Sequence, residues 1–281
     1  MRDALSDVIV DNEEGVRMNL LFHCDERTRW TSVLRRGAAD LEFLSFGLLR
    51  LRDGERYAHP SLVEEHAVVI LGGRCRVDVA GEATIELGGR KDVFDGYASA
   101  IYVPPETPFV MLAIGDVEIA ICSASVDEGG PVTVVRPEDV NIRQVGKDNW
   151  TRTVTDIIGV NVGARRLIVG ETYNPPGNWS SAPPHRHDHN NPPHECDLEE
   201  VYFYRFDPPQ GFGLQRVYEP TIGLDETYTV EADDVVAIPV GYHPVVSAPG
   251  YRMYYLWALA GEERSLLPWD DPEHAWVKAD A

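Results

Sequence analysis

The residues best suited to chemistry gather in residues 183–204, PPHRHDHNNPPHECDLEEVYFY. His185 and His187 stand two positions apart, so on a β-strand both imidazoles point to the same face. Glu200 opens the apolar run VYFYRF, and His243 follows the turn IPVGY further along the chain. Three imidazoles and one carboxylate suit Mn²⁺, Fe²⁺, Zn²⁺ or Ni²⁺ better than Ca²⁺ or Mg²⁺. If these residues converge, the chain can hold one such ion and leave positions open for a substrate.

The other polar residues of this stretch fit a solvated loop better than a set of ligands. His189 and His194 do not follow the strand alternation of the two preceding histidines. Cys196 has no second cysteine at zinc-finger spacing. Glu199 must point away from any metal that its neighbour faces, because adjacent strand residues point to opposite sides. A histidine-rich loop is by itself typical of surface, and the distant glutamate and PVGYH turn are what favour a metal.

Short strands dominate the elements that must position these residues. They are rich in β-branched and aromatic residues and are bounded by Gly, Pro, Asp or Asn. The predicted strands include LEFLSFGLLRL, HAVVILGGRCRVDVAG, ATIEL, SAIYVPP, FVMLAI, VEIAICSA, RLIVGETY, EVYFYRF, GFGLQRVY, ETYTV, VVAIPV and RMYYLWAL. This spacing predicts an all-β fold of antiparallel sandwiches or barrels. Helical periodicity is scarce, and its strongest candidate is TRWTSVLRRG, residues 28–37.

A weak internal repeat divides the chain into two halves. SAIYVPPETPFVML (99–112) resembles VVAIPVGYHPVVS (235–247): each is an apolar strand, a proline turn and a second apolar strand. Turn-forming and acidic residues at 127–139 are typical of a linker. We therefore predict an N-terminal barrel over residues 1–130 and a C-terminal barrel, carrying the site, over residues 131–281.

The motifs of the second half resemble a known family. HRH, a glutamate at the head of a strand, and PVGYH are similar to the two cupin motifs, although Asp207 stands where the first motif usually has a glycine. Together, YNPPGNWSSAPPHRHD, LEEVYFYRF, QGFGLQRVY, IPVGYHPV and APGYRMYYLWALAG resemble the 5-deoxy-glucuronate isomerases. These are bicupin enzymes of bacterial myo-inositol catabolism, and the 4-deoxy-5-keto-hexuronate isomerases form a related branch. LEFLSFGLLRL, GGRKDVF and AIYVPP carry a weaker resemblance in the first half.

The resemblance implies a bicupin fold, in which two antiparallel β-barrels of the double-stranded β-helix, or jelly-roll, type share one chain. It also implies that one divalent transition metal, zinc, manganese or iron, is bound in the C-terminal barrel. The implied ligands are His185, His187, Glu200 and His243.

The first half lacks two of the four corresponding ligands. When the acidic pair of EEHAVVILGG is aligned with that of EEVYFYRF, Glu65 falls at the position of the glutamate ligand. His59 lies near the position of the second HxH histidine, but Tyr57 replaces the first and Pro108 replaces the distant histidine. We therefore predict that the N-terminal barrel binds no metal and serves to shape the C-terminal site. His66 is predicted to be an ordinary strand residue.

The resemblance implies conversion of 5-deoxy-D-glucuronate to 5-dehydro-2-deoxy-D-gluconate, an aldose–ketose isomerisation. A proton leaves the carbon beside the aldehyde and returns to the carbonyl carbon through an enediol, which needs a Lewis acid and a base. Strand alternation puts Tyr202 and Tyr204 on the face of the glutamate ligand. The substrate's carboxylate calls for an arginine: Arg216 is the first candidate, followed by Arg152, Arg186 and Arg205. The predicted catalytic residues are Arg216, Tyr218, Tyr202, Tyr242 and Gln215.

Composition restricts the partners and the compartment. The net charge of −21 repels nucleic acid and anionic membranes, and no apolar run reaches the roughly 18 residues that a membrane span needs. The acidic N-terminus, MRDALSDVIVDNEE, does not have the pattern of a secretion signal. We expect a cytoplasmic protein that binds a small anionic sugar acid. Paired barrels also favour a homo-oligomer, whose size the sequence leaves open.

Other functions remain open at this point. Another metal cupin enzyme, a hexuronate isomerase or a dioxygenase, would fit the same ligands, and a dioxygenase would consume oxygen. A sugar-acid-binding cupin without catalysis would show affinity without turnover. The sequence has no basic patch to support a DNA-binding regulator.

Overall fold

The computed structural model describes residues 8–11, 15–24, 28–60, 63–80 and 83–279. Its regular structure is almost entirely antiparallel β-sheet, with two short helical turns, η1 (Asp148–Trp150) and α1 (Trp276–Ala279). The predicted all-β fold is confirmed. No helix in the described ranges is long and apolar enough to cross a membrane. Residues 1–7 and 12–14, which carry much of the argument against a secretion signal, lie outside the described residues.

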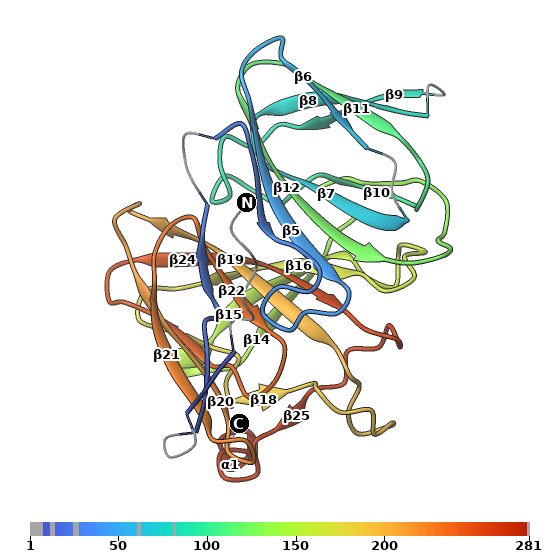
Figure 1. Ribbon diagram of the computed structural model, residues 1–281. Helices are drawn as coiled ribbons and strands as arrows, with labels where there is room; N and C mark the ends of the chain where they lie inside the picture. The colour runs from blue at the N-terminus through green and yellow to red at the C-terminus, as the bar shows by residue number, and fades with distance from the viewer. Residues whose placement is uncertain (1–7, 12–14, 25–27, 61–62, 81–82, 280–281) are drawn as a thin grey trace.

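The first half of the chain forms a barrel from two facing sheets (Figure 1). The six-stranded sheet has the order β13 (Thr133–Val135), β10 (Ala100–Val103), β7 (Glu64–Gly72), β12 (Val117–Ser125), β5 (Leu44–Leu51) and β4 (Trp30–Leu34). The four-stranded sheet has the order β6 (Arg56–His59), β11 (Phe109–Ala113), β8 (Arg74–Val79) and β9 (Ala83–Gly88).

The second half forms a similar barrel. Its seven-stranded sheet has the order β14 (Asn141–Val145), β15 (Arg152–Ile158), β16 (Ile168–Asn174), β24 (Arg252–Ala260), β19 (Glu199–Asp207), β22 (Asp234–Ile238) and β3 (Leu21–His23). Its four-stranded sheet has the order β17 (Trp179–Ser180), β23 (Val245–Ser247), β20 (Gly213–Glu219) and β21 (Leu224–Val230). Two-stranded ribbons pair β18 (His185–Arg186) with β25 (Trp269–Asp270), and β1 (Val8–Asp11) with β2 (Gly15–Met18).

The sheets cross the expected division of the chain at both ends. The segment expected to be a linker, residues 127–139, contains β13, which pairs with β10 of the first barrel. Near the start of the chain, β3 pairs with β22 of the second barrel. The assignment of residues 1–130 and 131–281 to separate domains stays a prediction, and the strand pairing shows that β3 belongs to the sheet of the second half.

The predicted helix over residues 28–37 is wrong, because β4 is a strand paired with β5. The indole of Trp30 lies directly against Gly47 of that neighbour, where a Cβ would come within 2.2 Å of the ring. A glycine here lets the large ring lie flat on the sheet, so a tertiary contact overrides the local pattern.

The two large sheets pack face to face and share one core. Alternate residues of β5 and β19 meet there, and the rings of Phe46 and Phe203 lie 5.4 Å apart between centroids. The opposite faces line the barrel interiors. The interior of the first barrel is filled mainly by apolar side chains such as Val68, Ile70 and Ile121, whereas that of the second receives histidine, glutamate and tyrosine side chains.

Two buried carboxylates join the halves reciprocally. Glu65 of β7 accepts backbone N–H groups from residues 165–167, at 2.6–2.7 Å. Glu199 of β19 accepts those of residues 42–44, just before β5. Each carboxylate thus satisfies three consecutive backbone donors of the other half, in charge-assisted hydrogen bonds that are among the strongest in proteins. Glu199 does point away from its neighbour, as strand alternation predicts.

Candidate metal centre

Three histidines from separate segments meet inside the second barrel. One ligand nitrogen from each of His185, His187 and His243 lies within 4.8 Å of the others. The ring centroid of His243 is 4.9 Å from that of His185 and 5.0 Å from that of His187. His187 and His243 are almost completely buried. Residues far apart in the sequence therefore form one compact group of nitrogen donors.

The carboxylate of Glu200 completes this group. Its Oε2 atom lies 3.1 Å from Nε2 of His187 and 3.3 Å from Nε2 of His243. Glu200 is at the second position of β19, paired with Ile238 of β22, so the sheet register fixes its direction. The four residues that the sequence spacing indicated thus lie together, as the ligands of a single metal ion must.

Hydrogen bonds to the backbone fix the orientation of two rings. Nδ1 of His187 lies 2.7 Å from the carbonyl of Leu198, and Nδ1 of His243 lies 2.9 Å from the carbonyl of Gly241. A carbonyl only accepts, so each Nδ1 carries a proton and each Nε2 faces Glu200. Nε2 of His243 is buried without a hydrogen-bond partner. This pattern, with Nδ1 held by a backbone carbonyl, is typical of metal-binding histidines.

Burial keeps two of these imidazoles neutral. It lowers the pKa of His185 well below its usual value, with a further contribution from His243, and lowers the pKa of His243 to about 4. For His187, burial also lowers the pKa, but the hydrogen bond and charge of Glu200 outweigh it and the pKa is raised. The buried carboxylate therefore favours a positive charge between itself and the imidazoles, which a proton or a metal ion can supply.

The C-terminal segment holds the first ligand in place. His185 pairs with Asp270 of β25, and the amide of Asp271 donates to the carbonyl of Pro184 at 2.8 Å. The Asp271 carboxylate also accepts the hydroxyl of Tyr218 at 2.5 Å. Figure 1 shows β18, β25 and α1 together at one end of the second barrel. The sequence offered no signal for this contact.

A glycine turn presents His243 to the site. Gly241 has φ +90°, and a Cβ there would lie 2.6 Å from the carbonyl oxygen of Tyr218. Its amide donates to the Asp188 carboxylate at 2.6 Å, while its carbonyl receives the proton of the His243 ring. Only glycine fits this left-handed position without strain. The PVGYH motif therefore has a local structural reason for its glycine.

Gln215 supports the same turn from β20. Its amide nitrogen donates to the carbonyl of His243 at 2.8 Å, and its side-chain oxygen accepts the hydroxyl of Tyr204 at 2.6 Å. Gln215 is fully buried. It holds the backbone of His243 and, with both ends of its side chain engaged, its contacts are those of a positioning residue.

Two tyrosines form a wall of the site. The ring of Tyr202 is 6.0 Å from that of His243 and 4.5 Å from that of Tyr255. The Tyr202 hydroxyl lies 2.9 Å from Oγ of Ser181, and the Tyr255 hydroxyl bonds to Ser180. Burial raises the pKa of both phenols. They therefore remain protonated at neutral pH and can donate hydrogen bonds.

Three of the predicted catalytic residues face away from this interior. The guanidinium of Arg216 lies 4.0 Å above the ring of Tyr218 and pairs with Asp225 at 2.7 Å. The rings of Tyr218 and Tyr242 stack on each other at 5.2 Å. Arg216 is already paired with an acid and is partly exposed, so its position does not favour binding of the substrate carboxylate. Sequence alternation had separated this face from Gln215, but could not say which face was inside.

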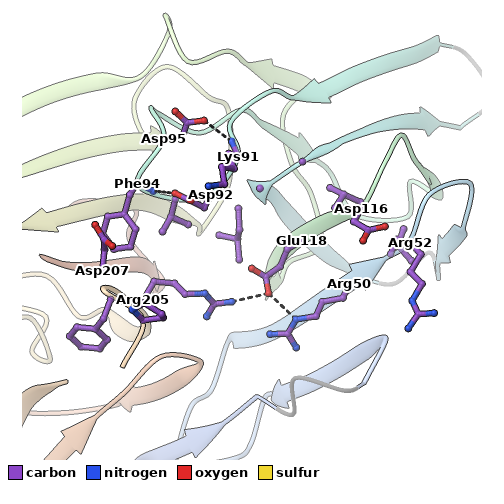
Figure 2. Close-up of a pocket in the computed structure, with 18 of the residues that line it drawn as sticks. Arg50, Arg52, Lys91, Asp92, Phe94, Asp95, Asp116, Glu118, Arg205 and Asp207 are labelled. Carbon is purple, nitrogen blue, oxygen red and sulfur yellow. Dashed lines mark hydrogen bonds and ion pairs between the residues drawn. The ribbon is translucent and has the colours of Figure 1, made fainter. Parts of the chain in front are cut away.

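Two further arginine candidates are also bound by acids. Arg186 pairs with Glu219 at 2.9 Å. Arg205 pairs with Glu118 at 2.8 Å, at the edge of a hollow of about 1490 Å³ between the halves (Figure 2). Figure 2 shows Arg205 and Arg50 converging on Glu118 from opposite barrels. The ion pairs of Glu118 with Arg205 and Arg50 connect the two halves at this hollow. None of the four candidate metal ligands lines it.

Arg152 differs from the other three candidate arginines, because it is buried and has no acidic partner in the described part of the chain. It begins β15, is buried with 8% of its surface exposed, and donates from one terminal nitrogen to the carbonyl of Trp150 at 3.1 Å. Its Nε has no hydrogen-bond partner. Its charge contributes to lowering the pKa of His185, after burial and the two other histidines. Among the candidate arginines it is the one with a place in the interior of the second barrel.

In the first barrel, the strand register shows that the predicted alignment of Glu65 with Glu200 is wrong by one residue. His66 pairs with Val103 as Glu200 pairs with Ile238, so His66, not Glu65, occupies the position of the glutamate ligand. Glu65 is the counterpart of Glu199. The ring of His66 lies 4.6 Å from that of His59, and its Nδ1 lies 2.8 Å from Oγ of Ser123. That this barrel binds no metal stays a prediction.

The comparisons with known proteins agree with this architecture. Residues 20–277 match the family model described as the KduI/IolB family. The chain is 38% identical over 267 residues to a 5-deoxy-glucuronate isomerase of Geobacillus kaustophilus, covering 95% of this chain and 92% of that protein.

Solved structures give the same result for the fold. The crystal structure of an IolB-like protein from Salmonella typhimurium LT2 superposes with a TM-score of 0.89 at 35% identity, covering 92% of this chain and 99% of that one. The oxalate decarboxylase of Bacillus subtilis, studied for its Mn(II) centres, superposes with a TM-score of 0.63 at 13% identity, covering 93% and 83%. The latter likeness shows the cupin fold alone, and the bicupin prediction is confirmed.

Proposed function

The chain belongs to the KduI/IolB family and is an isomerase, and we propose that it converts 5-deoxy-D-glucuronate to 5-dehydro-2-deoxy-D-gluconate with the help of one divalent metal ion. This reaction would place it in the breakdown of myo-inositol. The proposed substrate follows from the similarity to 5-deoxy-glucuronate isomerases, and the proposed metal follows from the residues of the site. Zinc, manganese and iron all suit the donors.

The observation that carries the proposal is the convergence of three imidazoles and one carboxylate in a buried cupin interior. Nε2 of His243 is an orphaned buried acceptor, and burial keeps His185 and His243 in the neutral form that a metal binds. The residues present therefore fit a transition metal, with His185, His187, Glu200 and His243 as its ligands. Such an ion would act as a Lewis acid, stabilising negative charge on the oxygens of an enediolate.

The surrounding residues would hold and orient the substrate. We propose that the protonated hydroxyl of Tyr202 donates a hydrogen bond to a reacting oxygen, since burial keeps its proton in place and Ser181 fixes its direction. Gln215 keeps His243 in register by binding its carbonyl. Of the five catalytic candidates from the sequence, Tyr202 and Gln215 have contacts that support a part in this reaction.

The test is turnover in D₂O. The purified protein is stripped with chelator, reloaded separately with Zn²⁺, Mn²⁺ or Fe²⁺, and incubated under nitrogen with 5-deoxy-D-glucuronate. We expect the ketose to form with at least one metal, without oxygen. If part of the proton that leaves the adjacent carbon is passed directly to the former carbonyl carbon, less deuterium is incorporated there. The ketose still forms.

The stripped protein is the matched control and should be inactive until metal is restored. Failure to form the ketose with any of the three ions would contradict the proposal. Turnover that requires oxygen would instead favour a cupin dioxygenase.

A further inference from the structure

Arg152 lies on the inner face of the large sheet of the second barrel. Its neighbour two positions along β15, Val154, pairs with Thr172, which pairs with Tyr255 of β24. The hydroxyl of Thr172 accepts the indole N–H of Trp257 on that face. Since residues two apart on a strand share a face, the side chain of Arg152 points to the side of Thr172 and Tyr255, the interior that also holds the metal candidates.

This arginine carries a charge without a counter-charge. No carboxylate lies within ion-pair distance of it in the described part of the chain, and the ionisable groups that raise its pKa are the two tyrosines, 255 and 202. Arg186, Arg205 and Arg216 each pair with an acid. Arg152 does contact Trp150, through the carbonyl at 3.1 Å and the ring at 5.9 Å from its centroid, but neither contact supplies a negative charge. A buried cation without an acidic partner is costly.

A second unsatisfied polar atom lies on the same face. Asn174 of β16 is two positions beyond Thr172, is buried, and its side-chain oxygen has no hydrogen-bond partner. Its amide nitrogen donates to the carbonyl of Asn178. A buried donor on Arg152 and a buried acceptor on Asn174 are what a polar ligand with both an anionic group and a hydroxyl would satisfy.

We propose that Arg152 forms a subsite for the carboxylate of a sugar acid whose carbonyl end lies at the histidine–glutamate group. The inference rests on the proposed function and deepens it, because it names the residue that selects an acid over a neutral sugar. Arg152 would bind the carboxylate by charge-assisted hydrogen bonds, for which its fork of N–H donors is suited. The carboxylate in turn supplies the missing counter-charge, in a protein whose overall field repels anions.

The test compares an acid with the matching neutral sugar. Binding of D-glucuronate and of D-glucose to the zinc-loaded protein is measured by calorimetry, for the wild type and for Arg152→Gln. A hydrogen-bonded charge contributes about 1.5–3 kcal/mol, so the preference for the acid should fall by about 10- to 100-fold in the variant. Bound zinc, measured in parallel, should not change.

Arg252→Gln is the matched control, because this exposed arginine pairs with Asp207 in the hollow between the halves, which none of the candidate metal ligands lines. It should keep the wild-type preference. Arg152→Met serves as a second variant, since an apolar side chain of similar length removes the buried charge without introducing a new polar group.

The outcomes separate this inference from the proposed function. The binding preference is measured without turnover, so it decides the role of Arg152 even if 5-deoxy-D-glucuronate is not isomerised. An Arg152→Gln protein that keeps the preference for D-glucuronate overturns the inference. If neither the Gln nor the Met variant folds, the arginine is structural and the inference is likewise overturned.

Discussion

His243 shows how a single side chain joins sequence motif, buried turn and chemistry. Its Nδ1 is fixed by the carbonyl of Gly241, its own carbonyl is held by Gln215, and its Nε2 is left facing Glu200. Rare residue types at characteristic spacing made this group predictable. The arginines were not predictable in the same way, because a sequence does not show that Arg216 is paired outside and Arg152 is unpaired inside.

The first prediction concerns His243→Ala. The variant should lose a metal ligand, with metal affinity and turnover reduced by more than about 100-fold, since even residues that only orient ligands change affinity 10- to 100-fold. Metal content is measured by elemental analysis after equilibration with limiting zinc. His194→Ala, an exposed residue of the loop before β19, is the control and should bind zinc normally. Full metal content in His243→Ala would show that the ligand assignment is wrong.

The second prediction concerns acid stability. Burial lowers the pKa of His59 to about 4 and that of His66 to about 3, whereas an unfolded histidine titrates near 6.5. The unfolded state therefore binds more protons below about pH 6.5, so these residues make the free energy of unfolding fall as the pH drops from about 6.5 toward 4. Above pH 6.5 they contribute no pH dependence.

Urea unfolding at several pH values measures this slope. The double variant His59→Gln/His66→Gln should show a shallower loss of stability on acidification than the wild type, while both respond equally to the histidines of the second barrel. Identical slopes would mean that the two histidines of the first barrel are not buried as neutral groups.

At the scale of elements, strand pairing decided what local pattern could not. Residues 28–37 looked helical, yet Trp30–Leu34 is a strand because β5 offers a glycine beneath the indole. The two Glu-Glu pairs that open β7 and β19 are identical in sequence and were aligned with each other. The strand register instead puts His66 opposite Val103, where the second barrel has Glu200 opposite Ile238. A one-residue shift exchanges the two faces of a strand, so sequence similarity alone aligned an interface residue with a ligand.

The third prediction tests the ribbon of β18 and β25. Removing residues 269–281 deletes the strand that pairs with His185 and Arg186 and the acceptor of the Tyr218 hydroxyl. We expect weaker zinc binding, by about 10-fold or more, because His185 loses the pairing that orders it. Arg252→Ala, which removes an exposed ion pair with Asp207 at the opposite end of β19 from Glu200, is the control and should behave as the wild type. Unchanged zinc affinity after truncation would mean that the ribbon does not order the ligand.

At the scale of the whole molecule, the two barrels depend on each other. Their large sheets share a core, and Glu65 and Glu199 bind backbone donors across it in both directions. The two-barrel plan was predictable from the number and spacing of strands. The reciprocal carboxylates were not, because each acts on residues about 100 to 157 positions away in the chain.

The fourth prediction follows from these carboxylates. Glu199→Gln replaces a charged acceptor of three backbone N–H groups by a neutral amide, and should lower the free energy of unfolding by about 2–4 kcal/mol. Guanidinium unfolding measures the change, with the exposed Glu42→Gln as control. Glu65→Gln should be destabilising for the same reason and should leave metal content unchanged. Loss of metal in folded Glu65→Gln would contradict its assignment to the interface.

The position of β3 has a consequence for aggregation through the edge of the second barrel's large sheet. Without Leu21–His23, strand β22 would end the large sheet of the second barrel and present a row of free backbone groups. Such an open edge is a template for strands of other molecules and thus for aggregation. The amide of Cys24 donates to Asp233, and that of Ala237 to Leu20, on either side of the pairing. Strand β3, from near the start of the chain, therefore covers this sheet edge. If the second half were expressed alone, we would expect it to aggregate through the exposed edge of β22.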